Sequence, residues 1–221
     1  MTKSGVLKMS NTNLEVSNVN PSMFVPQKLT YEEFLREYDG QYAEYVEGEI
    51  IKPMSVSQRH DFLTNFLITI LTFYTSTKKL GRICGEPYQM KIVLGDKIKG
   101  REPDIFFVKT ENLDRIGEQF FDGAADLVIE VISPESIMRD SVDKFEEYEA
   151  AGIKEYWIVN PNQRTANFYG YDENGKYKLL HLSAEGIFES RVIEGLWIKT
   201  DWLWQEDLPN LMDVLKDWKL V

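Results

Sequence analysis

The stretch "DLVIEVIS", Asp126 to Ser133, constrains the fold more than any other part of the sequence. Successive side chains of a strand point to opposite faces of a sheet. One face of this strand is expected to hold Leu127, Ile129 and Val131, and the other Val128, Glu130 and Ile132. Because both faces are apolar except at Glu130, the stretch predicts a central strand of a sheet that is covered on both sides.

The segments around this strand predict a mixed sheet flanked by helices, an α/β (α+β) fold. Thr30 and Glu33 form a capping box for a short helix, and a long helix is expected from near Ser57 to Gly81. Its predicted inward residues are Phe62, Phe66, Ile70 and Phe73, and further helices are expected at about 141–151 and in "DLPNLMDVLKDW". Extended segments are predicted in "YAEYVEGEII", with a turn at 47–48, and in "KEYWIVN". Two more are expected within 82–109, joined by a turn and a Lys/Gly-rich loop, and "RTANFYGY" and "KYKLLHL" are expected to form a hairpin.

Length and composition bound the domain organisation and the compartment. With 221 residues, 43% of them hydrophobic, the chain predicts a single domain over residues 27–221, preceded by a flexible N-terminal tail over 1–26. No apolar run approaches the roughly 20 residues of a membrane helix, so no membrane partner is expected. The single cysteine, Cys84, favours a cytoplasmic protein without disulfides.

The net charge of −11 argues against a broad cationic surface for nucleic acid. Any such role must depend on local clusters, namely "KKLGR" at 78–82 and the cations Lys91, Lys97, Lys99 and Arg101. A solvated charged face is the other interpretation of these clusters.

The acid inside the central strand is the main functional signal. An ionised carboxylate in an apolar layer costs several kcal/mol unless it is compensated. Glu130 therefore needs a paired Arg or Lys, a proton, or a divalent metal held with a second acid. Asp104, which begins an apolar strand behind Pro103, is a candidate for that second acid, although a Pro-Asp pair also occurs as a simple strand-entry turn. Mg²⁺ is commonly bound by one or two carboxylates, with water completing its coordination.

A lysine on the following helix could reach the same place. At roughly 100° per residue, Lys144 lies at the flank of the apolar stripe formed by Val142, Phe145 and Tyr148, whereas 146, 147 and 150 lie on the outer side. Lys144 is thus expected to reach back over the sheet, although many lysines in this position only lay their stem on apolar surface.

With these residues in place, the chain resembles the PD-(D/E)XK nucleases, and is most similar to the Uma-type restriction endonuclease family of bacteria. The matching stretches, which together cover about 28–200, are "YAEYVEGEII", "RHDFL", "EPDIFFV", "DLVIEVISPES", "DSVDKFEEYEAAGIKEYWIVNP" and "ESRVIEGLWI". The resemblance implies a restriction-endonuclease-like core in which Asp104 and Glu130 bind metal and Glu44 lies near them as a third acid. The superfamily pattern has lysine two residues after the second acid, where this chain has Ile132, so the resemblance implies that Lys144 replaces it.

The same resemblance gives further expectations about the site. His60 matches a family position, although a structural histidine fits equally well; Ser133 and Gln89 are candidates to hydrogen-bond the site acids. The implied cofactor is Mg²⁺, with Mn²⁺ as a substitute and the Val131 carbonyl as a further ligand. The implied activity is endonucleolytic cleavage of DNA, with weak, salt-dependent binding and a possible homodimer. Two alternatives stay open: a catalytically degenerate binding module on the same fold, and a metal-dependent hydrolase of another phosphodiester.

Overall fold

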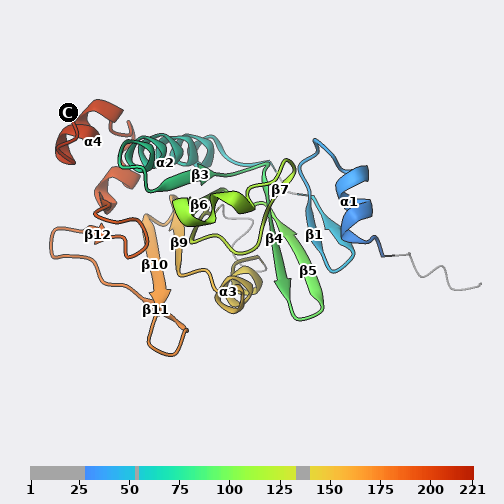
Figure 1. Cartoon of the computed structure of the whole chain (residues 1–221). Helices are drawn as coiled ribbons and strands as arrows, with labels where there is room; N and C mark the ends of the chain where they lie inside the picture. Colours follow the sequence, from blue (N-terminus) through green and yellow to red (C-terminus); the bar gives the residue numbers. More distant parts are fainter. Residues whose placement is uncertain (1–27, 53–54, 133–139) are drawn as a thin grey trace, which may run out of the picture.

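The computed structural model describes residues 28–52, 55–132 and 140–221, and its main feature is a six-stranded mixed sheet (Figure 1). The strand order is β11-β10-β9-β8-β6-β3. The predicted central strand is β8 (Leu127–Val131), which pairs in parallel with β9 (Glu155–Asn160) and antiparallel with β6 (Ile105–Lys109). The outer strands are β3 (Gly81–Cys84), β10 (Thr165–Tyr171) and β11 (Tyr177–Leu179). The predicted mixed α/β fold with a central, fully buried β8 is confirmed.

Helices cover both faces of this sheet, as the two apolar faces of β8 require. Helix α2 (Gln58–Thr77) packs on the face that carries Leu127, Ile129 and Val131. Helix α3 (Asp140–Ala151) packs on the opposite face, where Val128 shares a cluster with Tyr148 and Tyr156. The predicted alternation of side chains along β8 is therefore confirmed, and it leaves Glu130 on the α3 side.

The position of α2 was predicted correctly, but its buried stripe was not. Ser57 caps the helix through the N–H of His60, and the helix ends at Thr77. Phe62, which was expected to face inward, is 52% exposed. The buried residues are His60, Leu63, Leu67, Ile70, Leu71, Tyr74 and Thr75. The helix carries two apolar stripes at helical spacing, one rich in leucine and one rich in phenylalanine. The leucine-rich stripe faces the sheet, whereas Phe66 and Phe73 are partly buried at the edge of the same hydrophobic cluster.

A second sheet of five strands, in the order β2-β1-β5-β4-β7, lies beside the first. Its members are β1 (Glu44–Val46), β2 (Glu49–Ile51), β4 (Gln89–Leu94), β5 (Lys97–Arg101) and β7 (Phe120–Asp122). The Lys/Gly-rich segment that was predicted as a loop is strand β5, because it pairs along its whole length with β4. Helix α1 (Tyr31–Glu37), which has the predicted Thr30–Glu33 capping box, packs on this sheet through Tyr31 and Phe34.

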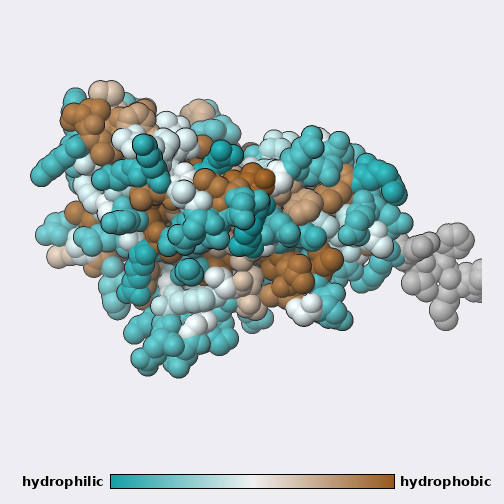
Figure 2. Space-filling view, in the orientation of Figure 1, coloured by the Kyte–Doolittle hydropathy of each residue, from teal (hydrophilic) through white to brown (hydrophobic). Residues whose placement is uncertain are grey.

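The C-terminal segment adds a small sheet and a short helix beside α2. Strands β12 (Ile187–Glu189) and β13 (Trp197–Lys199), which the sequence did not predict, form a hairpin, and a 3₁₀ helix (Thr200–Trp204) leads to α4 (Leu211–Asp217). Figure 2 shows apolar surface at α4, where Met212 is 51% exposed. Among the described residues, no helix has the length and apolar character needed to cross a bilayer.

Candidate functional site

The acidic residues converge at the C-terminal end of β8, through the register of neighbouring strands. Ile105 of β6 lies opposite Ile129 of β8, so one further step of the antiparallel register places Asp104 opposite Glu130. Cys84 of β3 lies opposite Phe106, so two further steps place Glu86 opposite Asp104. The strand order thus brings three acids that are distant in sequence into one row across the end of the sheet.

Asp104 is buried and is held by two elements at once. Its Oδ2 accepts a hydrogen bond from the backbone N–H of Val131 at 2.6 Å and lies 3.2 Å from Nε2 of His60. Burial alone would lower the pKa of His60, but the hydrogen bond to Asp104 and the negative charges of Asp104, Glu86 and Glu130 together raise it. The histidine therefore acts on the site by orienting Asp104.

Glu130 is compensated by a lysine and a tyrosine from α3. Its Oε1 lies 3.1 Å from Nζ of Lys144 and accepts a hydrogen bond from the hydroxyl of Tyr148 at 2.9 Å. Burial raises the pKa of Glu130 to about 7, although Lys144 opposes the shift. Burial would lower the pKa of Lys144, but Glu130 and Glu44 raise it instead, so this lysine stays cationic at neutral pH.

Glu44, at the start of β1, joins the same cluster from the second sheet. Its Oε1 lies 3.3 Å from Nζ of Lys144 and accepts the backbone N–H of Glu102, and its Oε2 accepts a hydrogen bond from Arg101 at 2.7 Å. Burial alone would raise the pKa of Glu44, but the cations Lys144 and Arg101 outweigh it and hold the pKa below its usual range. Lys144 therefore pairs with two carboxylates, Glu130, whose pKa is raised, and Glu44, whose pKa is lowered.

The outer face predicted for α3 is wrong at one position. Glu147 is buried and accepts hydrogen bonds from Arg101 and Lys99. These two cations were candidates for binding phosphate, but they are used inside the protein in ion pairs with Glu147 and Glu44. The prediction from the helical repeat failed at Glu147 because α3 packs against both sheets, so that the side of the helix expected to face solvent contacts β5.

The donor set fits a divalent cation. Among the residues that the structure describes, the hydrogen bonds to Asp104 use Oδ2 and those to Glu130 use Oε1, which leaves the second oxygen of each acid available. Within the same residues, no group of three His, Cys, Asp or Glu side chains is already arranged around a metal position. Two hard carboxylate oxygens with water completing the shell is the arrangement that Mg²⁺ favours.

Sequence reasoning missed one acid of the row and misplaced one polar residue. The side chain of Glu86 is partly accessible to solvent. Its carboxyl group is nevertheless partly desolvated by the surrounding protein, and this desolvation, together with the negative charges of Asp104 and Glu130, raises its pKa to about 7. Only its place two residues beyond β3 could have indicated it. Gln89 donates to the carbonyl of Ala43 and lies 3.4 Å from Glu102, rather than bonding Asp104 or Glu130. Ser133 lies outside the described residues.

Comparisons with known proteins place this chain in a family. The Uma2 family model, described as "Putative restriction endonuclease", matches residues 30–201. A solved structure from Anabaena variabilis ATCC 29413, described as "a putative nuclease belonging to DUF820", is similar with a TM-score of 0.64 and 18% identity, over 80% of this chain and 97% of that one. At this identity the likeness establishes a shared fold, and no curated protein matches the sequence significantly. The family model spans most of the chain, which therefore belongs to the Uma2 family.

Proposed function

We propose that this protein is a Mg²⁺-dependent endonuclease that hydrolyses phosphodiester bonds of DNA, and that Mn²⁺ can replace Mg²⁺. The observation that carries the proposal is the meeting of Asp104 and Glu130 at one register position of adjacent strands, with Nζ of Lys144 3.1 Å from Glu130. Two carboxylates and a lysine at a sheet end are the groups that metal-assisted phosphodiester cleavage needs. Membership of the Uma2 family supports the same reading.

The roles follow from the contacts of each residue. Asp104 and Glu130 would hold the ion, and the carbonyl of Val131 is the proposed further ligand. When bound, Mg²⁺ would polarise a phosphodiester oxygen and lower the pKa of a bound water. His60 and the N–H of Val131 fix the orientation of Asp104. Lys144 would orient the attacking water and offset the negative charge that develops on the phosphate.

Binding to DNA is proposed to be weak and strongly dependent on salt. The net charge is −11, and Lys99 and Arg101 are used in internal ion pairs, so few cations remain to neutralise phosphates. A symmetric homodimer would match the twofold symmetry of a duplex and present one site to each strand.

Cleavage assays on supercoiled plasmid test the proposal directly. Plasmid DNA, RNA and a small phosphodiester are offered side by side with Mg²⁺, Mn²⁺ or EDTA. Wild type should nick DNA only with metal, and Asp104→Asn and Glu130→Gln should abolish the activity while they keep the circular dichroism spectrum. Asp126→Asn is the matched control, because Asp126 is also buried but lies at the opposite end of β8, where it accepts the N–H of Lys109. Cleavage that persists in both site variants would refute the assignment, and cleavage of a different ester alone would refute DNA as substrate.

A non-catalytic binding module is the second candidate, because Lys144 already pairs with both Glu130 and Glu44. In that case Lys144, together with the hydroxyl of Tyr148, is sufficient to compensate Glu130, and no metal enters. Titration calorimetry separates the two: absence of heat with millimolar Mg²⁺ and Mn²⁺ supports the module, whereas saturable binding that Glu130→Gln removes supports the enzyme.

A further inference from the structure

A cavity of about 360 Å³ opens beside the acidic site, at the same end of the main sheet. One wall is the start of α2, where Arg59 directly precedes the His60 that contacts Asp104. Another wall is the turn after β9, which begins at Pro161. Since β9 is the parallel neighbour of β8, the turn at Pro161 leaves the sheet at the same end as Glu130.

Two arginines supply positive charge to this cavity. Arg59 donates to the carbonyls of Leu203 at 2.8 Å and Glu206 at 3.2 Å, and so fixes the C-terminal wall to α2. Arg164 is exposed and, within the described residues, no ion pair neutralises it. Its backbone has a φ of 50°, in the left-handed region that non-glycine residues rarely adopt. The turn therefore brings to this wall a cation that no described ion pair neutralises.

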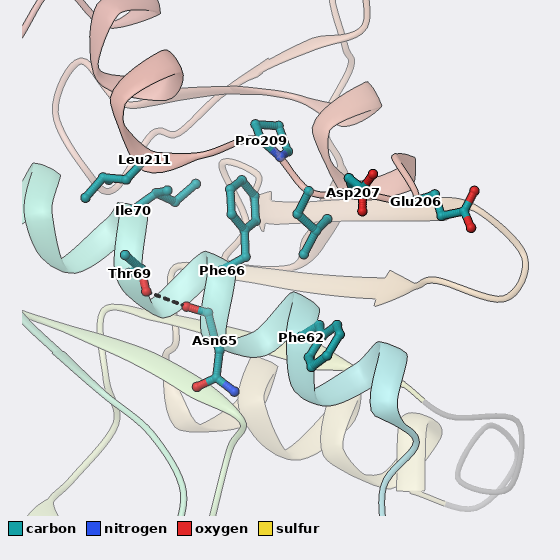
Figure 3. Close-up of a pocket in the computed structure, with 10 residues that line it drawn as sticks. Phe62, Asn65, Phe66, Thr69, Ile70, Glu206, Asp207, Pro209 and Leu211 are labelled. Carbon is teal, nitrogen blue, oxygen red and sulfur yellow. Dashed lines mark hydrogen bonds between the residues drawn. The ribbon is translucent and has the colours of Figure 1, made fainter.

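Two aromatic side chains also line the cavity, together with Gln58 and Glu206. Phe62 is 52% exposed on the first turns of α2, and Trp204 is half-buried at the end of the 3₁₀ helix. Figure 3 is a close-up of a neighbouring pocket that shares Phe62 and Glu206 with this cavity, and it shows Phe62 standing out from α2 below the segment that contains Glu206, whose carboxylate points away from Phe62. Aromatic faces beside arginine are the surface on which unpaired bases stack, because every base has an apolar π face and every nucleotide an anionic phosphate.

We infer that this cavity binds one unpaired nucleotide of the nucleic-acid strand next to the cleavage site. The base packs on Phe62 and Trp204, and the phosphate is neutralised by Arg164. The inference rests on the proposed nuclease function and extends it, because it assigns the substrate an unpaired segment beside the scissile phosphate. Arg164 would then neutralise a phosphate of the substrate, which Lys99 and Arg101 cannot do because they are used in internal ion pairs.

Fluorescence anisotropy in EDTA tests the inference without cleavage. A labelled single-stranded DNA and a fully paired hairpin are titrated with wild type, Phe62→Ala and Arg164→Gln at several salt concentrations. Each variant should weaken single-strand binding about fivefold or more, and Arg164→Gln should reduce the salt slope by about 0.7, the value for one phosphate contact. Matched controls are Tyr42→Ala, an aromatic residue that is 55% exposed, and Arg36→Gln, an exposed cation on α1; both should bind like wild type.

The outcomes separate this inference from the proposed function. Unchanged binding in Phe62→Ala and Arg164→Gln overturns the nucleotide site even if the protein cleaves DNA. Weakened binding in both, in a protein that cuts nothing, keeps the nucleotide site and refutes the nuclease. An equal loss of affinity for the paired hairpin overturns the stacking of an unpaired base, and a wild type that binds no single strand overturns the inference entirely.

Discussion

The affinity of the acidic site for Mn²⁺ should rise with pH, because a proton and the metal compete for Glu130. Its pKa is about 7, whereas metal binding needs the ionised carboxylate. The sign is fixed by this competition: acid protonates Glu130 and weakens binding, and base ionises it and strengthens binding. The variant Glu130→Gln should remove both the proton that competes with Mn²⁺ and most of the affinity for Mn²⁺.

The expected magnitude follows from the titration of one group. With a pKa of about 7, roughly a tenth of Glu130 is ionised at pH 6 and roughly nine tenths at pH 8. The apparent association constant for Mn²⁺ should therefore be about tenfold higher at pH 8 than at pH 6. If Glu86, whose pKa is also about 7, releases a second proton, the rise will be steeper, and Glu86→Gln will return it to about tenfold.

Titration calorimetry with Mn²⁺ at both pH values measures this directly. Glu102→Gln is the matched control, because Glu102 is a buried acid with a pKa of about 7 that hydrogen-bonds Gln89 rather than the site acids. It should keep the tenfold rise. Equal affinity at pH 6 and pH 8 in the wild type, or an unchanged rise in Glu130→Gln, would refute the reasoning that Glu130 is a metal ligand.

Three further predictions concern stability, each measured by urea denaturation. Burial raises the pKa of Glu102 to about 7, so the contribution of this group to stability is lost as pH rises from about 4.5 through 7. The variant Glu102→Gln should therefore increase the free energy of unfolding by up to about 3 kcal/mol at pH 8 and by little at pH 5. An equal increase at both pH values would contradict this. Arg101→Met leaves two buried carboxylates without their shared partner and should cost about 3–5 kcal/mol; a neutral effect would mean that Lys99 and Lys144 suffice. Leu67→Ala on the fully buried face of α2 should cost about 2–5 kcal/mol, several times more than Phe62→Ala, and equal costs would disprove the observed orientation of the helix.

The fold was predictable where a local pattern and its tertiary partner agree. The alternation along β8 identified a central strand and both of its faces, because a strand that is buried on two sides is apolar on both faces, here with the exception of Glu130. The capping box of α1 and the start of α2 were also found, since caps are local hydrogen bonds that three or four residues determine.

The errors occurred where tertiary contacts decide between local options. Strand β5 resembles a polar loop, but pairing with β4 and burial of Lys99 and Arg101 against Glu147 make it a strand. Glu147 was assigned to solvent because one helix analysed alone has only one buried stripe, whereas α3 contacts two sheets. Glu86 was missed because its place opposite Asp104 depends on the pairing of β3 with β6, which no local pattern reports.

Lys144 bonds a carboxylate on each of the two sheets, Glu44 of β1 and Glu130 of β8, from a helix that belongs to neither. A single ammonium group therefore couples the positions of three separate elements. An ion that bound beside Glu130 would compete with Lys144 for this carboxylate and would shift the lysine towards Glu44. Metal binding would then be transmitted to β1 in the five-stranded sheet, so that hydrogen exchange at β1 would report events that occur at the end of β8.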